Sequence, residues 1–341
     1  MPDSGYKEVI LRDVTLQSGQ FMPEMRLAYR IYGTLNRQRD NLVVFPTYFT
    51  GRHSSNAPYF GSGRALDPAR HCILVPCLIG NGESSSPSNH QGKTGGANFP
   101  HVSIHDNIRL QRSLIDMVCP VERVALVLGW SMGGMQAFEW ATQFPDFVEA
   151  ALPICATARC SPHNFVFLEG VKAALKSDAA WQDGDYTTPP LRGLRAFGRA
   201  YAGWAYSAAF FDDGLYREIG FTDIEALLTD WEEDHLSWDA NDLLHKIATW
   251  QHADVSANGT YQGSLETALD AVTARMIVMP SSTDMYFSAA RAKREVAMIR
   301  NAEFRPFLSD WGHCACTPSS PDPRFMEFLD TAISDLLAPL Q

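Results

Sequence analysis

The stretch that decides the fold is Val124-Ala-Leu-Val-Leu128 followed by Gly129-Trp-Ser-Met-Gly-Gly134. Its first five residues are apolar and predict a buried strand, because the run is too short for a helix. The pattern G-x-S-x-G follows, centred on Ser131, and residues 135–144 favour a helix that Pro145 ends. A strand, a glycine-flanked turn and a helix form the setting of a nucleophile elbow, in which a strained turn presents the serine hydroxyl above a sheet. An ordinary strand-to-helix turn made of small residues is the alternative interpretation.

The composition is that of a globular protein: 341 residues, 45% hydrophobic and 20% charged, with a formal net charge of −11. No basic run is available to neutralise phosphates, so we expect neither nucleic acid nor a membrane surface as a partner. No apolar stretch approaches the ~20 residues of a membrane span, and the first residues lack the basic and apolar regions of a signal peptide. The seven cysteines are odd in number and irregularly spaced, which favours reduced thiols and a cytoplasmic location.

Further apolar runs continue the rhythm of strands and helices along the chain. Residues 9–16 and 26–33 alternate between apolar and polar, which predicts an opening antiparallel hairpin. Later strands are expected over 41–46, 72–76, 148–154, 275–280 and 303–308, and helices over 104–118, 288–299 and 323–337. This alternation predicts an α/β fold in which a mostly parallel central sheet has helices on both faces.

Residues 157–270 break this rhythm. They are rich in Ala, Trp, Tyr and Phe and contain no buried strand run. Helical patterns are expected near 164–176, 193–211, 223–230 and 239–250. We interpret the segment as a helical lid insertion over the carboxyl edge of the sheet, with residues 1–156 and 271–341 forming the core domain.

A serine nucleophile needs a base within hydrogen-bond reach, usually a histidine that a carboxylate orients. In this topology the chain order is serine, acid, histidine. His313 follows the last expected strand and is the only histidine after position 252, so it is the candidate base. Asp284 follows strand 275–280 and is the preferred acid. Asp310 competes with it but lies three residues from His313 on the same loop, where it is awkwardly placed to reach the far imidazole nitrogen.

An oxyanion hole requires two backbone N–H groups aimed at the developing negative charge. Met132, directly after the nucleophile, is expected to supply one of them. Phe49 in the loop after strand 41–46 is expected to supply the other, with Tyr48 and Thr50 as alternatives. The run His313-Cys-Ala-Cys316 resembles a metal motif, but no second ligand cluster supports it, so neither a metal nor another cofactor is expected.

Four stretches resemble the homoserine O-acetyltransferase branch of the α/β-hydrolase superfamily. They are Gly129-Trp-Ser-Met-Gly-Gly-Met-Gln-Ala-Phe-Glu-Trp140, Phe49-Thr-Gly51, Ala69-Arg-His-Cys-Ile-Leu-Val-Pro76 and Phe99-Pro100. The similarity runs from about residue 26 to residue 335. It implies an α/β-hydrolase fold, the triad Ser131–Asp284–His313, a helical lid and a homodimer formed through that lid.

One departure from the transferases concerns the substrate. In those enzymes an Asp that holds the substrate ammonium directly follows the catalytic His, whereas here that position is Cys314. A thiol pairs with a cation much less well than a carboxylate does. Arg199 and Tyr206 resemble the family's substrate-carboxylate pair, although a purely structural role in the lid is an equal alternative.

Other stretches look more like a subgroup of bacterial esterases that act on short-chain acetate esters: Gly80-Asn-Gly-Glu-Ser-Ser-Ser-Pro-Ser-Asn89, Tyr201-Ala-Gly-Trp204 and Trp311-Gly-His313. We therefore expect a serine esterase that hydrolyses a small-molecule ester through an acyl-enzyme on Ser131. An acyl-CoA-dependent O-acetyltransferase with the same triad is the alternative, and a non-catalytic scaffold is the third possibility. The expected substrate pocket comprises Thr50, Trp130, Arg199, Tyr206, Trp311 and Cys314.

Overall fold

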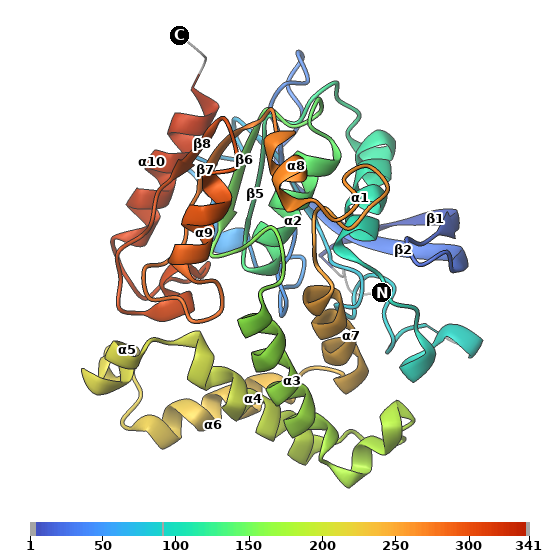
Figure 1. The fold of residues 1–341 in the computed structure, drawn as a ribbon, viewed down its shortest axis with the longest axis vertical. Coiled ribbons are helices and arrows are strands. Elements are labelled where there is room, and N and C mark those ends of the chain that lie inside the picture. Colours follow the sequence, from blue (N-terminus) through green and yellow to red (C-terminus); the bar gives the residue numbers. More distant parts are fainter. Residues whose placement is uncertain (1–4, 91, 339–341) are drawn as a thin grey trace.

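The computed structural model describes residues 5–90 and 92–338. Within them, eight strands form one sheet in the order β1-β2-β4-β3-β5-β6-β7-β8 (Figure 1). The strands are β1 Lys7–Thr15, β2 Phe21–Tyr32, β3 Leu42–Val44, β4 Cys72–Pro76, β5 Leu126–Trp130, β6 Ala150–Ile154, β7 Arg275–Val278 and β8 Ala302–Phe304. The pairs β1–β2 and β2–β4 are antiparallel, and β4, β3, β5, β6, β7 and β8 run parallel. The opening hairpin and the mostly parallel sheet are confirmed.

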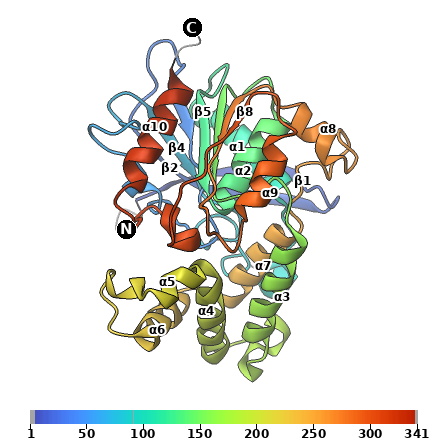
Figure 2. The ribbon, with the colours of Figure 1, turned by 60° about the vertical axis from the view of Figure 1, so that its left-hand side comes forward.

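Helices cover both faces of this sheet, as expected. Figure 2 shows α10 (Phe325–Leu337) on one side of the strands and α1 (Ile104–Val118), α2 (Met132–Gln143) and α9 (Ala289–Val296) on the other. The first residue before α1, Ser103, accepts a hydrogen bond from the backbone of Asp106, whose carboxylate accepts one from the Ser103 backbone. This capping box satisfies two donors at the start of the helix and explains why α1 begins where the sequence pattern places it.

The strand and helix around the serine are closer together than the sequence pattern suggests. Gly129 and Trp130 continue the ladder of β5, opposite Pro153 and Ile154 of β6, and α2 begins at Met132 rather than at residue 135. Val124, expected inside the strand, forms only an isolated bridge. The pairing with β6 thus carries the strand to the residue before Ser131, so that the turn contains this serine alone.

A second layer of helices lies beyond the end of the sheet in Figures 1 and 2. We call it the helical layer. It contains α3 Pro162–Lys176, α4 Leu191–Ala205, α5 Ala208–Asp212, α6 Ile224–His235 and α7 Ala240–Gln251. The single helix expected near 193–211 is in fact two helices, because Tyr206 adopts an extended conformation and Ser207 caps α5. The Ser207 hydroxyl also donates to the carbonyl of Asp310, which ties this break to the loop that carries His313.

The end of the expected insertion returns to the sheet. Tyr261, shortly before α8 (Leu265–Asp270), donates a hydrogen bond of 2.6 Å to the carbonyl of Thr142 in α2. The expected lid bounds of 157–270 therefore include a segment that packs against the core. The division into a core and a lid stays a prediction.

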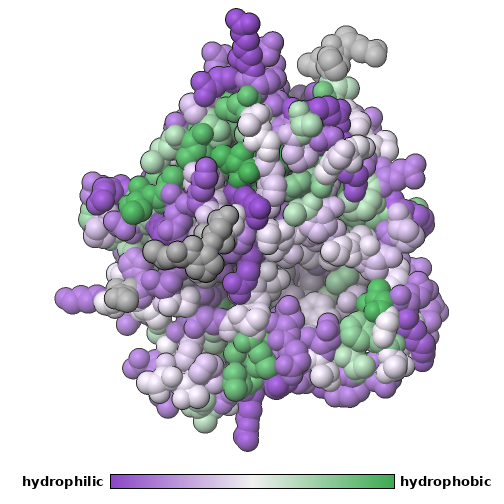
Figure 3. Space-filling view, turned by 180° about the vertical axis from the view of Figure 1, so that it is seen from behind, coloured by the Kyte–Doolittle hydropathy of each residue, from purple (hydrophilic) through white to green (hydrophobic). Residues whose placement is uncertain are grey.

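The surface seen from behind is mostly hydrophilic, with hydrophobic residues gathered in separate patches (Figure 3). Among residues 5–90 and 92–338, no helix combines the length and the apolar character that crossing a bilayer requires. All seven cysteines lie within these residues, and each is unpaired.

Candidate active site

The turn at Ser131 has the geometry of a nucleophile elbow. Ser131 has φ 59° and ψ −128°, a conformation that is strained for a residue with a side chain. A Cβ atom at Gly129 would lie 2.2 Å from the carbonyl carbon of Gly133, and one at Gly133 would lie 2.8 Å from the carbonyl oxygen of Pro46. The glycines of the motif therefore allow the start of α2 to pack against β5 and against the loop after β3.

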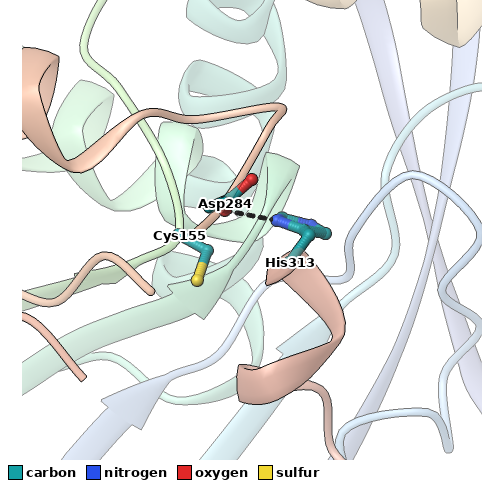
Figure 4. Close-up of side chains that lie close together, drawn as sticks. All are labelled: Cys155, Asp284 and His313. Carbon is teal, nitrogen blue, oxygen red and sulfur yellow. Dashed lines mark hydrogen bonds and ion pairs between the residues drawn. The ribbon is translucent and has the colours of Figure 1, made fainter. Parts of the chain in front are cut away.

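The side chains of His313 and Asp284 contact each other, although 29 residues separate them in the chain. The imidazole Nδ1 lies 2.7 Å from Oδ2 of Asp284, and both side chains are buried (Figure 4). The other carboxylate oxygen, Oδ1, accepts hydrogen bonds from the backbone N–H groups of Tyr286 and Phe287 at 2.8 and 3.0 Å. These bonds fix the carboxylate, which in turn holds a proton on Nδ1 and leaves Nε2 available as a base.

The competing acid, Asp310, occupies a different position. Its side chain is exposed, and its backbone carbonyl is used by the Ser207 hydroxyl. Asp284 is thus the carboxylate that contacts the imidazole.

The charge of His313 depends on two opposing effects. Burial of the imidazole, the largest single influence, disfavours the protonated form, but Asp284 and the neighbouring Cys155 together favour it and raise the pKa of His313 to about 9. Trp130 stacks on the imidazole with a centroid distance of 4.6 Å, and the edge of Tyr48 contacts the indole at 4.7 Å. A π-face beside the ring also favours the imidazolium that forms during general-base catalysis.

Cys155, which the sequence analysis did not single out, lies beside this pair (Figure 4). One ligand-type atom from each of Cys155, Asp284 and His313 lies within 4.8 Å of the others. The donor set fits a metal ion poorly, because Nδ1 and Oδ2 already bind each other and burial raises the pKa of Cys155 well above its usual value, which keeps the thiol protonated. Its place directly after β6, at the carboxyl edge of the sheet, is the signal that could have identified it.

A cavity of about 520 Å³ opens in front of Ser131 and His313, which both line it. Its size is typical of a small-molecule site. Six further candidate residues from the sequence analysis contribute to its wall: Tyr48, Phe49, Thr50, Trp130, Tyr206 and Cys314. Burial raises the pKa of Cys314 to about 12, so this wall presents a neutral thiol at physiological pH.

Backbone donors without acceptors lie at the positions expected for an oxyanion hole. Among the described residues, the N–H group of Met132 has no hydrogen-bond acceptor, and the same holds for the N–H groups of Tyr48, Phe49 and Thr50. Unpaired donors beside a buried serine are suited to stabilising negative charge on a substrate oxygen.

Two expected pocket residues are not part of the cavity wall. The Arg199 guanidinium lies 2.8 Å from Glu225 and 2.7 Å from Glu232, both on α6, so these carboxylates occupy its donors. Trp311 packs against Phe210 of α5 at a centroid distance of 5.3 Å and does not line the cavity. The contacts of Arg199 fit the structural alternative, and a role of either residue in substrate binding stays a prediction.

Residues 40–316 match the family model described as the alpha/beta hydrolase fold. The chain belongs to this family. It is 36% identical over 327 residues to the ethyl acetate hydrolase of Pseudomonas veronii, an alignment that covers 95% of this chain and 93% of that one. It is 30% identical over 314 residues to the homoserine O-acetyltransferase of Chloroherpeton thalassium, with 88% and 82% covered. The structure of the acetyl esterase MekB superposes with a TM-score of 0.94 at 35% identity, covering 98% of this chain and 97% of that one.

Helix α6 gives this α/β hydrolase cavity-lining residues that the sequence analysis did not name. Asp230, Trp231, Asp234 and His235 all line the cavity. The spacing of Asp230 and Asp234, four residues apart on one helix, indicates a shared face, but the sequence does not show where that face points. Within the described residues, no lysine or arginine lines the cavity of this hydrolase.

Proposed function

We propose that this α/β hydrolase is a carboxylic ester hydrolase that cleaves short-chain, acetate-type esters through an acyl-enzyme on Ser131. The observation that carries the proposal is the convergence of Ser131 and the His313–Asp284 pair on one cavity. The ethyl acetate hydrolase and the acetyl esterase among its relatives support an acetate ester as substrate.

In the proposed mechanism, His313 takes the proton of the Ser131 hydroxyl while its oxygen attacks the ester carbonyl carbon. The N–H groups of Met132 and Phe49 stabilise the resulting oxyanion, and Asp284 stabilises the imidazolium. The imidazolium then protonates the departing alcohol, which leaves an acetyl group on Ser131. The same imidazole then deprotonates a water molecule, whose oxygen attacks the acyl carbonyl, and the imidazolium returns the proton to the Ser131 oxygen as the acid is released.

The charge of the cavity favours hydrolysis over the alternative function, O-acetyltransfer from acetyl-CoA. That alternative rests on the similarity to homoserine O-acetyltransferases. Homoserine carries a carboxylate and an ammonium group, and coenzyme A carries phosphates. The described cavity wall offers no lysine or arginine for an anion, Arg199 is paired with Glu225 and Glu232, and Cys314 replaces the ammonium-binding carboxylate.

A direct comparison of the two reactions tests the proposal. The protein is incubated with ethyl acetate or p-nitrophenyl acetate alone, and separately with acetyl-CoA and homoserine. We expect saturable release of acetate from the esters, decreasing from acetate to butyrate to octanoate esters, and no O-acetylhomoserine. Saturable transfer from acetyl-CoA with slow ester hydrolysis would support the transferase instead.

The pH dependence of hydrolysis should report the ionisation of His313. The base must be neutral, and its pKa is raised to about 9, so kcat/KM should rise with pH and level off only above about pH 9. Initial rates on p-nitrophenyl acetate from pH 6 to 10, corrected for spontaneous hydrolysis, measure this rising part of the pH–rate profile, which we call the limb. A limb near the ordinary imidazole pKa of about 6.5 would contradict the strong influence of Asp284.

Cys314→Asp should shift this limb to higher pH. A second carboxylate beside His313 stabilises the imidazolium further, so kcat/KM at pH 7.5 should fall by up to about tenfold for each unit by which the pKa rises. Cys314→Ser is the matched neutral control and should keep the limb of the unmodified protein. If the pH dependence of kcat/KM in Cys314→Asp equals that of the unmodified protein, a charge at residue 314 does not affect the pKa of His313.

We further propose that the helical layer acts as the lid of the expected core domain and that two chains pair through it. Two exposed apolar residues on α3, Phe165 and Val166, support a contact at this layer. Sedimentation of the protein and of a Phe165→Glu, Val166→Glu variant tests the pairing, which predicts a dimer for the first and a monomer for the second.

A further inference from the structure

Lys246, on α7, is a fully buried lysine outside the catalytic group. Its side chain is 0% exposed, and within the described residues its ammonium nitrogen Nζ has no hydrogen-bond partner. A buried ammonium without a partner is costly, because the charge has lost its hydration. An apolar side chain of similar length would avoid that cost, so the position calls for an explanation beyond packing.

Two aromatic rings provide the contacts of this ammonium. Nζ lies 3.9 Å from the ring centroid of Trp238 and 5.1 Å from that of Phe49. Both distances fall within the range of cation–π attraction, which is strongest where water is excluded. Arg52 provides a second cation for the Trp238 ring: its guanidinium carbon Cζ lies 4.6 Å from the ring centroid.

Phe49 belongs to the loop that we propose supplies the second oxyanion donor. The backbone of this loop is fixed at both ends. At Thr47 the carbonyl accepts a hydrogen bond of 2.8 Å from Gln136, and at Gly51 the carbonyl accepts one of 3.3 Å from Asn81. Between these ends, the N–H groups of residues 48–50 have no acceptor among the described residues. A turn hydrogen bond of 2.9 Å from the Gly51 N–H to the carbonyl of Tyr48 closes this part of the loop, and the side-chain contacts of Phe49 add to it.

The ring of Phe49 is the side chain that points into the helical layer. It stacks on Tyr201 and Phe197 of α4 at centroid distances of 5.6 and 6.4 Å, and it contacts Trp250 of α7 at 6.1 Å. Among the residues that the structure describes, Lys246 adds the one cation in contact with this ring. A shift of the ring would move the backbone amide attached to it, and displacements of about 1 Å at a reacting centre can cost up to 10²-fold in rate.

We propose that Lys246 is a positioning residue for the oxyanion loop, in which its ammonium holds the ring of Phe49 and thereby keeps the loop amides directed at the substrate oxygen. This inference rests on the proposed esterase function. Lys246 does not touch the substrate, since it does not line the cavity.

The charge on Lys246 should change within the working pH range. Burial lowers the pKa of this lysine to about 7, even though the nearby Asp242 opposes the decrease. Five other charged or titratable groups interact with this ammonium. They are Asp239, which caps α7, Asp242 and His245 in α7, His235 in α6, and Arg52 in the oxyanion loop. Asp242 does not bind this ammonium, since Nζ has no hydrogen-bond partner among the described residues; its two carboxylate oxygens accept hydrogen bonds from the backbone N–H and the hydroxyl of Ser88. Above about pH 7 the amine is neutral and the attraction to both rings is lost, so in the unmodified protein this loss is superposed on the rise of kcat/KM that deprotonation of His313 produces.

The test compares Lys246→Met, which keeps the length of the side chain and removes its charge, with the unmodified protein. At pH 6 we expect kcat on p-nitrophenyl acetate to be about tenfold lower in the variant, with KM changed less than twofold. At pH 9.5 both side chains are neutral, so the ratio of the two rates should approach one. Ionisation of His313 is common to both proteins and cancels in the ratio. A ratio that stays constant across pH, or equal rates at pH 6, would overturn the proposal.

A double-mutant cycle identifies Phe49 as the partner. Phe49→Leu keeps the backbone amide and an apolar side chain but removes the aromatic face. If the charge acts through this ring, the double variant should be no slower at pH 6 than the slower of the two single variants, whereas additive losses would contradict the proposed contact.

Two further measurements separate this inference from the esterase function and from a loss of folding. Removing the buried charge should raise the melting temperature at pH 6, and the difference should narrow by pH 10, because the unfolded chain binds this proton more tightly than the folded protein does between about pH 7 and 10.5. A variant that is slower but no less stable therefore cannot be explained by unfolding. If the unmodified protein hydrolyses no acetate ester, the esterase proposal itself fails. If it does and the rate ratio is independent of pH, the role of Lys246 alone is refuted.

Discussion

Replacing Ser131 by Ala should reduce the hydrolysis of acetate esters by about 10⁶-fold, because no acyl-enzyme can then form. The fold should be retained, since the hydroxyl is the only group removed and the strained turn accepts Ala as it accepts Ser. Initial rates on p-nitrophenyl acetate measure the loss, and circular dichroism checks the fold. An active-site phosphonate should label the unmodified protein at Ser131 and leave the variant unlabelled.

Ser113→Ala is the matched control for this substitution. Ser113 lies on the exposed side of α1, and its hydroxyl donates only to the carbonyl of Arg109 in the same helix. Its loss should change the rate by less than about twofold. Full activity in Ser131→Ala, or phosphonate labelling at another serine, would rule out the proposed nucleophile.

Replacing Asp284 by Asn should lower kcat by on the order of 10⁴-fold. An amide can donate a hydrogen bond to Nδ1, which stabilises the tautomer with its proton on Nε2, and such an imidazole cannot accept the proton of Ser131. The pKa of His313 should also fall, since burial then acts without the opposing carboxylate. The pH–rate profile of the residual activity should show a limb well below pH 9.

Asp310→Asn is the control for this prediction, because Asp310 is the other carboxylate that the sequence offers. Its side chain is exposed, whereas the buried imidazole bonds to Asp284, so we expect a change of less than about twofold. Equal losses in the two variants would mean that the His313–Asp284 hydrogen bond does not orient the base during catalysis.

The pH dependence of thermal stability provides a second test of Asp284→Asn. The folded-state pKa of His313 lies above its usual value, so the ion pair contributes stability below about pH 6.5, and this contribution is lost as the pH rises through about 9. The variant should therefore be destabilised more at pH 6 than at pH 10. Thermal unfolding at the two pH values measures the difference.

Much of the fold could be predicted from local patterns. The buried runs, the glycines around Ser131 and the caps of α1 act within a few residues of the chain, so neighbouring residues are enough to indicate them. Errors arose where a distant partner decides the outcome. The β5 ladder extends to Trp130 because β6 pairs with it, and the helix expected near 193–211 breaks where Ser207 bonds to the loop of His313.

The candidate site shows the same division. The order serine, acid, histidine in the chain predicted the residues that converge on the cavity and the acid that contacts His313. The two alternatives for Arg199 could not be separated from the sequence, because no local pattern shows that Glu225 and Glu232, 26 and 33 residues further along, bind its guanidinium. Cys155 and the cavity-facing residues of α6 were missed for a related reason, since a helix face carries no mark of what it faces.

The sequence by itself determined the elbow and the strand-and-helix order, and it indicated the serine, acid and histidine that we propose react, because each follows from short-range geometry and chain order. Only the tertiary structure decided which charges meet. It pairs Arg199 with α6, leaves the described cavity wall without a lysine or arginine, and buries Lys246 between Phe49 and Trp238. Electrostatic interactions depend on distance through space and on exclusion from water, and neither quantity can be obtained from the spacing of residues along the chain.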